Sequence, residues 1–412
     1  MTKVMTTGRP AHEVLAWSRD LAGPALRSAV ETLPASMRRI AGYHFGWQDE
    51  HGRPTTGSGS GKAIRPALVL LSAEAVGVPT GAPSAVPAGP GGPIGSAIGL
   101  SGPVGSAIGP SGPIGSSSSG ASGGHGGSDG SGGAGLGAAS GAPGGLNLGA
   151  MSAAVAVELV HNFSLLHDDV MDGDVTRRHR PTAWSVFGVS AAILAGDALL
   201  TLAFDVLGAD GHPAAPDGAR VLGAAVLDLV EGQSADTAFE ARAEVSLPEC
   251  VSMAEGKTGA LLGGACALGA LFGGGTPEQI EHLRGFGDRL GLAFQLVDDL
   301  LGIWGDPAVT GKPVYSDLRN RKKSLPVVAA LASGTPAGDE LAALYRRDQE
   351  LTGPDLVHAA ELIEAAGGRA WSQSRADDLL VEALGHLTSA DPVPRAATEL
   401  TTLAHLVTHR DH

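Results

Sequence analysis

A long run of Gly, Ser, Pro and Ala, from about Val78 to Gly149, limits what this chain can fold into. The run has almost no charged or aromatic side chains and contains a degenerate repeat, in which Gly-Pro-Ile-Gly-Ser-Ala-Ile-Gly begins at Gly92 and a close copy begins at Gly102. Such a segment cannot bury enough apolar surface to offset its conformational entropy. Residues 79–149 are therefore predicted to be a disordered, low-complexity insertion.

The flanking segments, 1–78 and 150–412, have apolar residues at helical spacing and no alternating strand pattern of useful length. We expect them to form one all-α domain that the insertion interrupts. The predicted helices cover 11–21, 26–41, 62–76, 151–172, 189–208, 219–240, 248–271, 277–301, 324–332, 338–349, 354–366, 369–387 and 393–409.

The charge balance excludes some classes of function. The formal net charge is −15 and the pI is about 5.3, which argues against binding to nucleic acid. The most apolar stretch, 259–275, is short of a clean membrane span, so no integral membrane protein is expected. Cys250 and Cys266 have apolar surroundings in the sequence, and no signal peptide is evident at the N-terminus. These features favour a cytoplasmic location.

Three aspartates end the predicted helix 151–172, in Leu-Leu-His-Asp-Asp-Val-Met-Asp. Asp168 and Asp172 are four residues apart and share a helix face, with Asp169 beside them. Like charges repel there, and the carboxyl end of a helix disfavours anions, so a bound cation is expected to neutralise them. Mg²⁺ is the natural candidate, because it binds few carboxylates together with substrate phosphates. The alternative is a solvated acidic helix end.

Basic residues follow the acidic ones, and the same order occurs twice. Arg177, Arg178 and Arg180 come directly after the first aspartates, and arginine binds phosphate oxygens in bidentate fashion. Simple ion pairing with the aspartates is the alternative. Farther along, Gln295, Asp298 and Asp299 share a predicted helix, and Lys312 and Lys322 follow. Two facing acidic helices of this kind could hold a Mg²⁺ cluster.

These motifs resemble the two aspartate-rich motifs of the trans-isoprenyl diphosphate synthase (polyprenyl synthetase) family. The resemblance extends, in family order, to Gly61-Lys62-Ala63-Ile64-Arg65-Pro66, Glu158 to His167, Gly196-Asp197, Gly232-Gln233-x-x-Asp236 and Lys257-Thr258. It implies an isoprenoid synthase fold, a helical bundle around a central cavity. It also implies an enzyme that condenses isopentenyl diphosphate with an allylic diphosphate, and the departing diphosphate is expected to take the proton.

The resemblance assigns roles to single residues. The implied catalytic residues are Asp168, Asp172, Lys257, Thr258, Gln295 and Asp298. The implied metal ligands are Asp168, Asp169, Asp172, Asp236, Asp298 and Asp299, with Mg²⁺ as the cofactor. The implied substrate-binding residues are Lys62, Arg65, His161, Arg177, Arg178, Gln233, Lys312 and Lys322. Of these, Lys62, Arg65, His161 and Arg178 are expected to hold isopentenyl diphosphate, whereas Arg177, Lys257 and Lys312 contact the allylic diphosphate.

The chain departs from the family pattern at several positions. Gly302 stands where the second acidic motif usually has Asp, so weaker metal binding is expected, with Asp306 compensating in part. Ala63 replaces a usual basic residue, and His179 replaces a common Gly. Phe163, five residues before Asp168, has the small Ser164 beside it, and no residue is inserted within the first acidic motif. By the resemblance this favours a C20 product, with C15 as the alternative, unless Phe163 is ordinary core packing.

Two other functions stay open at this point. A class I terpene cyclase shares the first acidic motif, although its second motif is absent from the sequence. A catalytically weak subunit could instead use the 79–149 repeat as a tether, since the repeat resembles segments that load terpenoid enzymes into bacterial protein shells. The family is commonly homodimeric, so a homodimer is expected.

Overall fold

A computed structural model describes residues 8–55, 63–77, 147–209, 211–307 and 314–409. Residues 79–146 of the predicted insertion, together with Lys62 and Lys312, lie outside these residues. The elements are α1 (Ala11–Glu31), α2 (Ala35–His44), α3 (Ile64–Ala75), α4 (Leu148–Met171), β1 (Thr176–Arg177), β2 (Arg180–Pro181), α5 (Ala183–Phe187), α6 (Val189–Ala209), α7 (Ala215–Ala241), α8 (Leu247–Ala254), η1 (Glu255–Gly259), α9 (Ala260–Phe272), α10 (Pro277–Trp304), α12 (Ser316–Arg319), α13 (Leu325–Leu331), α14 (Pro336–Tyr345), α15 (Gly353–Ala365), α16 (Gly368–Ser389) and α17 (Pro394–Thr408). The prediction of an all-α fold is confirmed.

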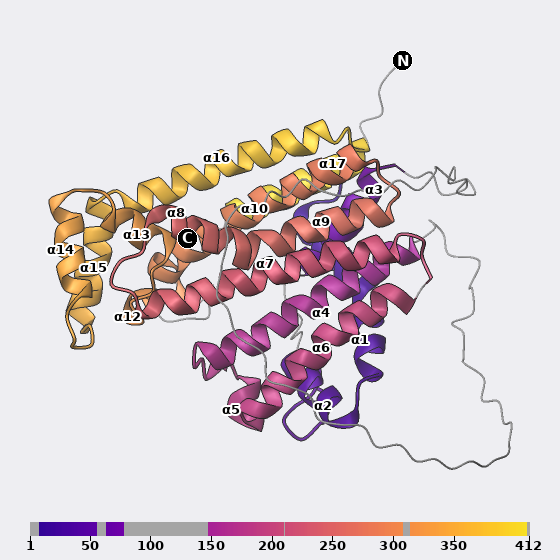
Figure 1. The fold of residues 1–412 in the computed structure, drawn as a ribbon, viewed down its shortest axis with the longest axis horizontal. Coiled ribbons are helices and arrows are strands. Elements are labelled where there is room, and N and C mark those ends of the chain that lie inside the picture. The colour runs from indigo at the N-terminus through magenta and orange to yellow at the C-terminus, as the bar shows by residue number, and fades with distance from the viewer. Residues whose placement is uncertain (1–7, 56–62, 78–146, 210, 308–313, 410–412) are drawn as a thin grey trace, which may run out of the picture. The chain divides into compact units, whose positions relative to one another are not determined.

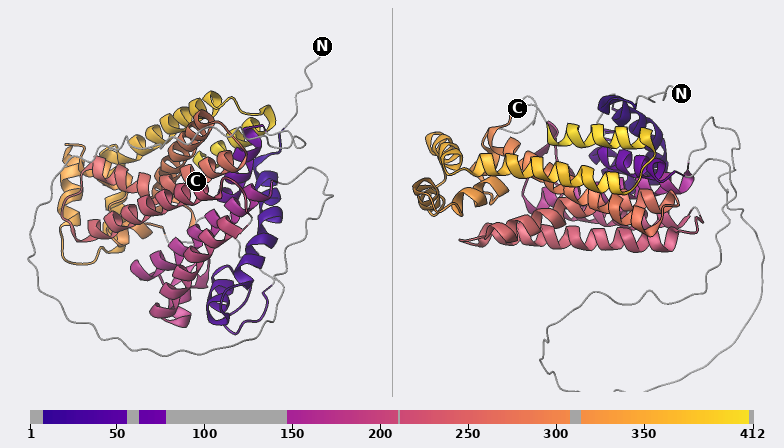
Figure 2. Two further views of the ribbon diagram at one scale, coloured as in Figure 1. Left: turned by 45° about the vertical axis from the view of Figure 1, so that its right-hand side comes forward. Right: turned by 90° about the horizontal axis from the view of Figure 1, so that it is seen from above.

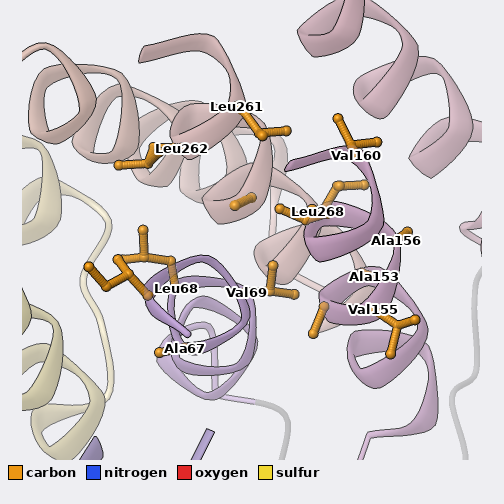
Figure 3. Packing of buried hydrophobic residues seen from close by; sticks show 14 of the residues in the cluster. Ala67, Leu68, Val69, Ala153, Val155, Ala156, Val160, Leu261, Leu262 and Leu268 are labelled. Atoms are coloured by element: carbon orange, nitrogen blue, oxygen red, sulfur yellow. The ribbon is translucent and has the colours of Figure 1, made fainter. Parts of the chain in front are cut away.

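Helix α9 lies at the centre of the bundle, in contact with α3, α4, α7 and α10 (Figure 1). Its residues are almost all buried and small or aliphatic, which lets neighbouring helices approach closely. Figure 3 shows Val69 of α3, Val160 of α4 and Leu268 of α9 meeting in this core. Helices α7 and α16 lie on opposite sides of α9 and α10 (Figure 2).

The N-terminal helices differ from the prediction. A single helix, α1, runs through Pro24, where the sequence indicated a break between 21 and 26. Proline removes one backbone hydrogen bond, but the apolar face from Val14 to Val30 stays buried and holds the helix together. The break falls instead at Pro34, just before α2. Helix α4 also begins earlier than the expected boundary at 150, because the Asn147 side chain accepts from Ala150 N and caps it.

The predicted helix 248–271 is divided by a π-helical turn, η1, which spans Glu255–Gly259. This turn contains Lys257 and Thr258, two of the residues assigned to catalysis. Extra-wide turns of this kind are rare in helices and occur often at functional sites. Nothing in the apolar spacing of the sequence distinguishes the turn from ordinary helix.

Two described helices, α4 and α6, are long and apolar enough to cross a membrane by length and composition alone. Within the bundle, 67% of the apolar window of α4 is buried, which identifies it as a core helix. In α6 the buried share is 33%. Helix α6 therefore has an apolar face that the described part of the chain leaves uncovered.

Glu399 of α17 is fully buried and joins the N-terminal segment to the bundle. Its carboxylate accepts from Arg9 Nη2 at 2.5 Å and from Arg395 Nε at 3.1 Å. Burial alone would raise the pKa of Glu399, but the hydrogen bonds from Arg9 and Arg395 hold it below its ordinary value.

Glu399→Gln should lower the free energy of unfolding by about 2 kcal/mol at pH 7, because two guanidinium groups lose their charged acceptor. A carboxyl whose pKa is depressed by folding stabilises the protein above the unfolded pKa, so the difference between variant and wild type should shrink as pH falls below about 4. Chemical denaturation at several pH values measures this difference in the free energy of unfolding. Glu340→Gln, in an exposed pair with His358, is the control and should change stability by less than about 0.5 kcal/mol. An equal loss in both variants would contradict the expectation.

Candidate active site

The first acidic motif lies at the carboxyl end of α4, and its three aspartates have different surroundings. Asp169 is buried at 1% exposure, and its Oδ1 accepts from Arg177 Nε at 2.6 Å. Asp168 is half-buried, whereas Asp172 is exposed and caps the helix. Burial raises the pKa of Asp168 to about 6, opposed by Lys257 and assisted by Asp172. The geometry therefore divides the motif into one structural carboxylate and two that face the site.

The second acidic motif, on α10, shows the same division. Asp298 is exposed, whereas Asp299 is 4% exposed and accepts from Gln295 Nε2 at 2.7 Å and from Leu325 N at 2.9 Å. Burial raises the pKa of Asp299 to about 7, an effect that Lys322 opposes. Thr258 Oγ1 donates to Gln295 Oε1 at 2.6 Å. A continuous chain of hydrogen bonds thus connects Thr258 of the π-helical turn to the start of α13.

Lys257 and Asp236 form an ion pair of 2.6 Å between η1 and α7. The pair depends on Gly232, one turn before Asp236. A Cβ at Gly232 would lie 2.2 Å from the backbone nitrogen of Lys257 and 2.8 Å from the carbonyl carbon of Gly256. Only glycine allows α7 and η1 to approach this closely, and the approach sets where Lys257 lies.

Lys322 brings the two acidic motifs to one place. Its ammonium interacts with Asp236, Asp299 and Asp317, and also with Asp172 of the first motif. Burial would lower the pKa of Lys322, but these carboxylates raise it well above its ordinary value. Lys322 therefore places a permanent positive charge among the acidic side chains.

Gly302, the departure from the family's second motif, faces a carboxylate from another segment. A Cβ at this position would lie 2.3 Å from Asp317 Oδ2. Ser316, next to Asp317, donates from its hydroxyl to the Gly302 carbonyl at 3.3 Å. Asp317 thus occupies the space that a side chain at 302 would need, and it interacts with Lys322 and Asp299. The sequence did not point to Asp317.

A second group of cations lies around Glu158 of α4, where Arg65 and Arg178 both interact with its carboxylate. Burial raises the pKa of Glu158, and the two arginines oppose the rise. Burial also lowers the pKa of His161 well below its ordinary value, with Arg65 and Arg178 contributing. Arg65, His161 and Arg178 are therefore brought together, as expected for one binding site. His44 of α2 also belongs to this group and was missed, since no motif marks it.

A cavity of about 510 Å³ lies between α4 and α7, and Asp168 contributes to its wall. Phe163 lies five residues before Asp168 on the same helix, about 7.5 Å along its axis. The other lining residues are Ser164, His167, Met171, Leu229, Val230, Gln233, Ser234, Thr237 and Ala238. Gly196 supports this wall, because a Cβ there would lie 2.3 Å from His167 Nε2. The cavity is mostly apolar, and its acidic end lies at the site.

The acidic side chains fit a hard cation. Within the described ranges no three His, Cys, Asp or Glu side chains are already placed to hold a metal ion. Asp169, Asp236 and Asp299 are engaged by protein groups, as described above. Asp169 Oδ2 and Gln233 Oε1 are buried and have no hydrogen-bond partner among the described atoms. Asp168, Asp172 and Asp298, the carboxylates that face the site, offer oxygen donors only, which suits Mg²⁺ and its bound waters.

An all-helical bundle in which two acidic motifs face each other across basic side chains defines the class of protein. Residues 146–361 match the family model described as "Polyprenyl synthetase". A (2E,6E)-farnesyl diphosphate synthase from Mycobacterium tuberculosis is 40% identical over 400 residues, 96% of this chain and 92% of the relative. A geranylgeranyl diphosphate synthase from the same organism is 39% identical over 390 residues, 94% and 91% of the two chains. A solved polyprenyl synthetase from Streptomyces coelicolor A3(2) is 39% identical, with a TM-score of 0.77 and coverage of 96% and 99%. The chain belongs to the polyprenyl synthetase family.

Proposed function

We propose that this protein is a Mg²⁺-dependent enzyme that condenses isopentenyl diphosphate with an allylic diphosphate and releases a C20 product. Short-chain trans-prenyltransferase activity follows from the family and from relatives named as farnesyl, geranylgeranyl and geranylfarnesyl diphosphate synthases. One observation carries the proposal: two acidic motifs meet beside an apolar cavity, with a separate basic group around Glu158. Two diphosphates can then bind at different places.

The metal and its ligands are part of the proposal. Asp168, Asp172 and Asp298 would hold Mg²⁺, and Asp169, Asp236 and Asp299 would support them through the groups that they contact. Bound Mg²⁺ would stabilise the negative charge that develops on a departing diphosphate. Lys257 would contribute to the same stabilisation, because it lies beside Asp168 and Asp236.

The protein's own residues account for the remaining chemistry. The allylic C–O bond breaks, and its electron pair leaves with the diphosphate. The double bond of isopentenyl diphosphate then supplies the electrons of the new C–C bond, and the departing diphosphate takes the proton that is lost. The apolar cavity excludes water from the cation, while Arg65, His161 and Arg178 hold the second diphosphate. Thr258 and Gln295, fixed by their mutual hydrogen bond, would lie near the reacting carbons.

The proposal is tested by incubating the purified protein with Mg²⁺, isopentenyl diphosphate and one allylic partner, which is dimethylallyl, geranyl or farnesyl diphosphate. The products are identified by mass spectrometry. The expected product is a C20 diphosphate. If product formation stops when the metal is chelated and resumes when Mg²⁺ is added back, the proposed dependence on Mg²⁺ is supported. A cyclic hydrocarbon formed without isopentenyl diphosphate would contradict the elongase and favour the terpene cyclase. No turnover with any allylic partner would favour the weak subunit. The relatives do not favour either alternative.

Phe163→Ala should lengthen the product by at least one five-carbon unit, because it enlarges the cavity on the side of α4. The side chain is 6% exposed and packs edge-on against His167, with ring centroids 4.8 Å apart. Phe204→Ala, on α6 and outside the cavity, is the control and should leave the product unchanged. Product distributions by mass measure the change. An unaltered distribution in a folded Phe163→Ala variant would show that Phe163 is ordinary core packing.

A homodimer is the proposed assembly. Large apolar side chains are exposed on α6 and α7: Val189, Leu194, Leu227 and Val230 are 50, 55, 71 and 47% exposed. A second copy that covers these neighbouring helices would remove them from water. Leu227→Lys should shift the molar mass in light scattering from dimer toward monomer, whereas Val381→Lys, equally exposed on α16, should not. A monomeric wild type would contradict the assembly.

A cytoplasmic location and a dispensable insertion complete the proposal. The domain consists of 1–78 and 150–412, and the insertion would serve as a tether for a protein partner or shell. Deletion of residues 79–149 should then leave turnover intact and remove the partner from a pull-down. Loss of turnover would show that the insertion belongs to the catalytic domain.

A further inference from the structure

The short hairpin that presents Arg177 and Arg178 has a strained turn. The arginine hairpin consists of β1 and β2, in which Thr176 pairs with Pro181 and Arg177 with Arg180. The two residues between the strands, Arg178 and His179, have φ angles of 51° and 60°. Residues other than glycine rarely adopt this left-handed backbone conformation, and it persists where the surrounding structure enforces it.

The carboxyl end of α2 contacts this hairpin directly. Tyr43 is 4% exposed, and its hydroxyl donates to the Pro181 carbonyl at 2.8 Å. In return, Arg180 donates to the carbonyls of Tyr43 and Gln48, each at 3.2 Å. The Arg180 guanidinium also lies 4.5 Å from the centre of the Tyr43 ring. The second strand of the hairpin is thus fixed to α2.

The next residue, His44, connects the same end of α2 to α4. Its side chain is hydrogen-bonded to the side chain of Asn162, which is 2% exposed. Asn162 Nδ2 in turn donates to the Glu158 carbonyl at 2.7 Å and to Glu158 Oε1 at 3.2 Å. Glu158 is the carboxylate that interacts with Arg65 and Arg178. Contacts therefore run from the hairpin through α2 and Asn162 to Glu158, whose carboxylate interacts with both arginines.

We propose that Tyr43, His44 and Asn162 are positioning residues that hold Arg178 and Arg65 for the diphosphate of the homoallylic substrate. This inference rests on the proposed function. The effect is specific to one of the two diphosphates, because Arg177 has a separate support in its 2.6 Å contact with Asp169. Burial and the charges of Arg177 and Arg178 lower the pKa of His44 to about 3, so the imidazole is neutral and contributes through hydrogen bonding.

Steady-state kinetics of the full-length protein tests this with His44→Phe, Asn162→Leu and Tyr43→Phe. We expect the KM for isopentenyl diphosphate to rise about tenfold, the size of one lost hydrogen bond in a buried network. The KM for the allylic diphosphate should stay within about twofold, since Asp169 still orients Arg177. His44→Gln retains a donor toward Asn162 and should restore most of the affinity. His51→Phe is the control, because His51 is exposed in the same segment and should have no effect.

The outcomes separate this inference from the proposed function. An inactive wild type would contradict the proposed function itself. An active wild type with both KM values unchanged in all three variants, or with both raised equally, would contradict only the positioning role. Melting temperatures identify variants that are misfolded. Tyr43→Phe removes a single oxygen atom and keeps the test valid if the larger changes prevent folding.

Discussion

Asp168→Asn should lower kcat by about 10³-fold, the largest effect expected from any single carboxylate of the site. Asp168 contributes to the acidic end of the cavity wall and lies near Lys257, Asp172 and Asp236. An amide retains the shape but cannot supply the negative charge that a divalent cation requires. Single-turnover rates across a Mg²⁺ titration measure the loss, and the half-saturating Mg²⁺ concentration should rise.

The matched control is Asp205→Asn, at an exposed position of α6 outside the cavity wall, which should leave both quantities unchanged. Both proteins should have the same melting temperature to within a few degrees, since the substitution keeps the shape of the side chain and leaves the backbone bond from Asp172 N to the Asp168 carbonyl in place. A kcat within tenfold of wild type in Asp168→Asn would remove this residue from the metal-binding set.

The second large effect is expected from a residue without a side chain. Gly232→Ala should cost about 3 kcal/mol of stability, because the added methyl group meets the Lys257 backbone at 2.2 Å and backbone atoms cannot rotate away. The two helices must separate, and a displacement of about 1 Å at Lys257 and Thr258 should reduce kcat by at least about 10²-fold. Denaturation and steady-state assays measure the two losses.

Gly223→Ala on the same helix provides the matched comparison. The nearest atom to a Cβ there is Phe204 Cε1 at 4.0 Å, so the methyl group has room. Alanine in place of glycine in a helix should then stabilise the protein by about 0.5–1 kcal/mol, with activity unchanged. If both variants behaved alike, the close approach of α7 and η1 would not be required for the site.

Much of the fold, and the grouping of many candidate site residues, could be predicted from the sequence because the patterns behind them are local. Three patterns each lie within a short stretch of sequence: the spacing of aspartates on one helix face, the basic residues after each acidic motif, and the apolar helical periodicity. Most of the helices appear close to where periodicity placed them. The break at Pro34 rather than Pro24 was not predictable, because tertiary packing of α1 outweighs the lost backbone hydrogen bond.

The contributions that were missed depend on contacts between segments far apart in the chain. The π-helical turn at Glu255–Gly259 is stabilised where α7 approaches it, and the approach depends on Gly232. Tyr43 acquires its role only when α2 meets the arginine hairpin, where its hydrogen-bond partners Arg180 and Pro181 lie 137 and 138 residues farther along the chain. His44 likewise depends on the contact of α2 with Asn162 of α4. No spacing rule within a single helix contains that information.

The contact between Gly302 and Asp317 has a consequence for how such sequences can change over time. Because the Asp317 carboxylate fills the space beside Gly302, a lone mutation to the family's usual aspartate would meet a clash and a like charge together. The acceptable residues at one position thus depend on those at the other, and the two sites should mutate as a pair. A redesign that replaced Gly302 by the family consensus would therefore harm this protein unless position 317 changed with it.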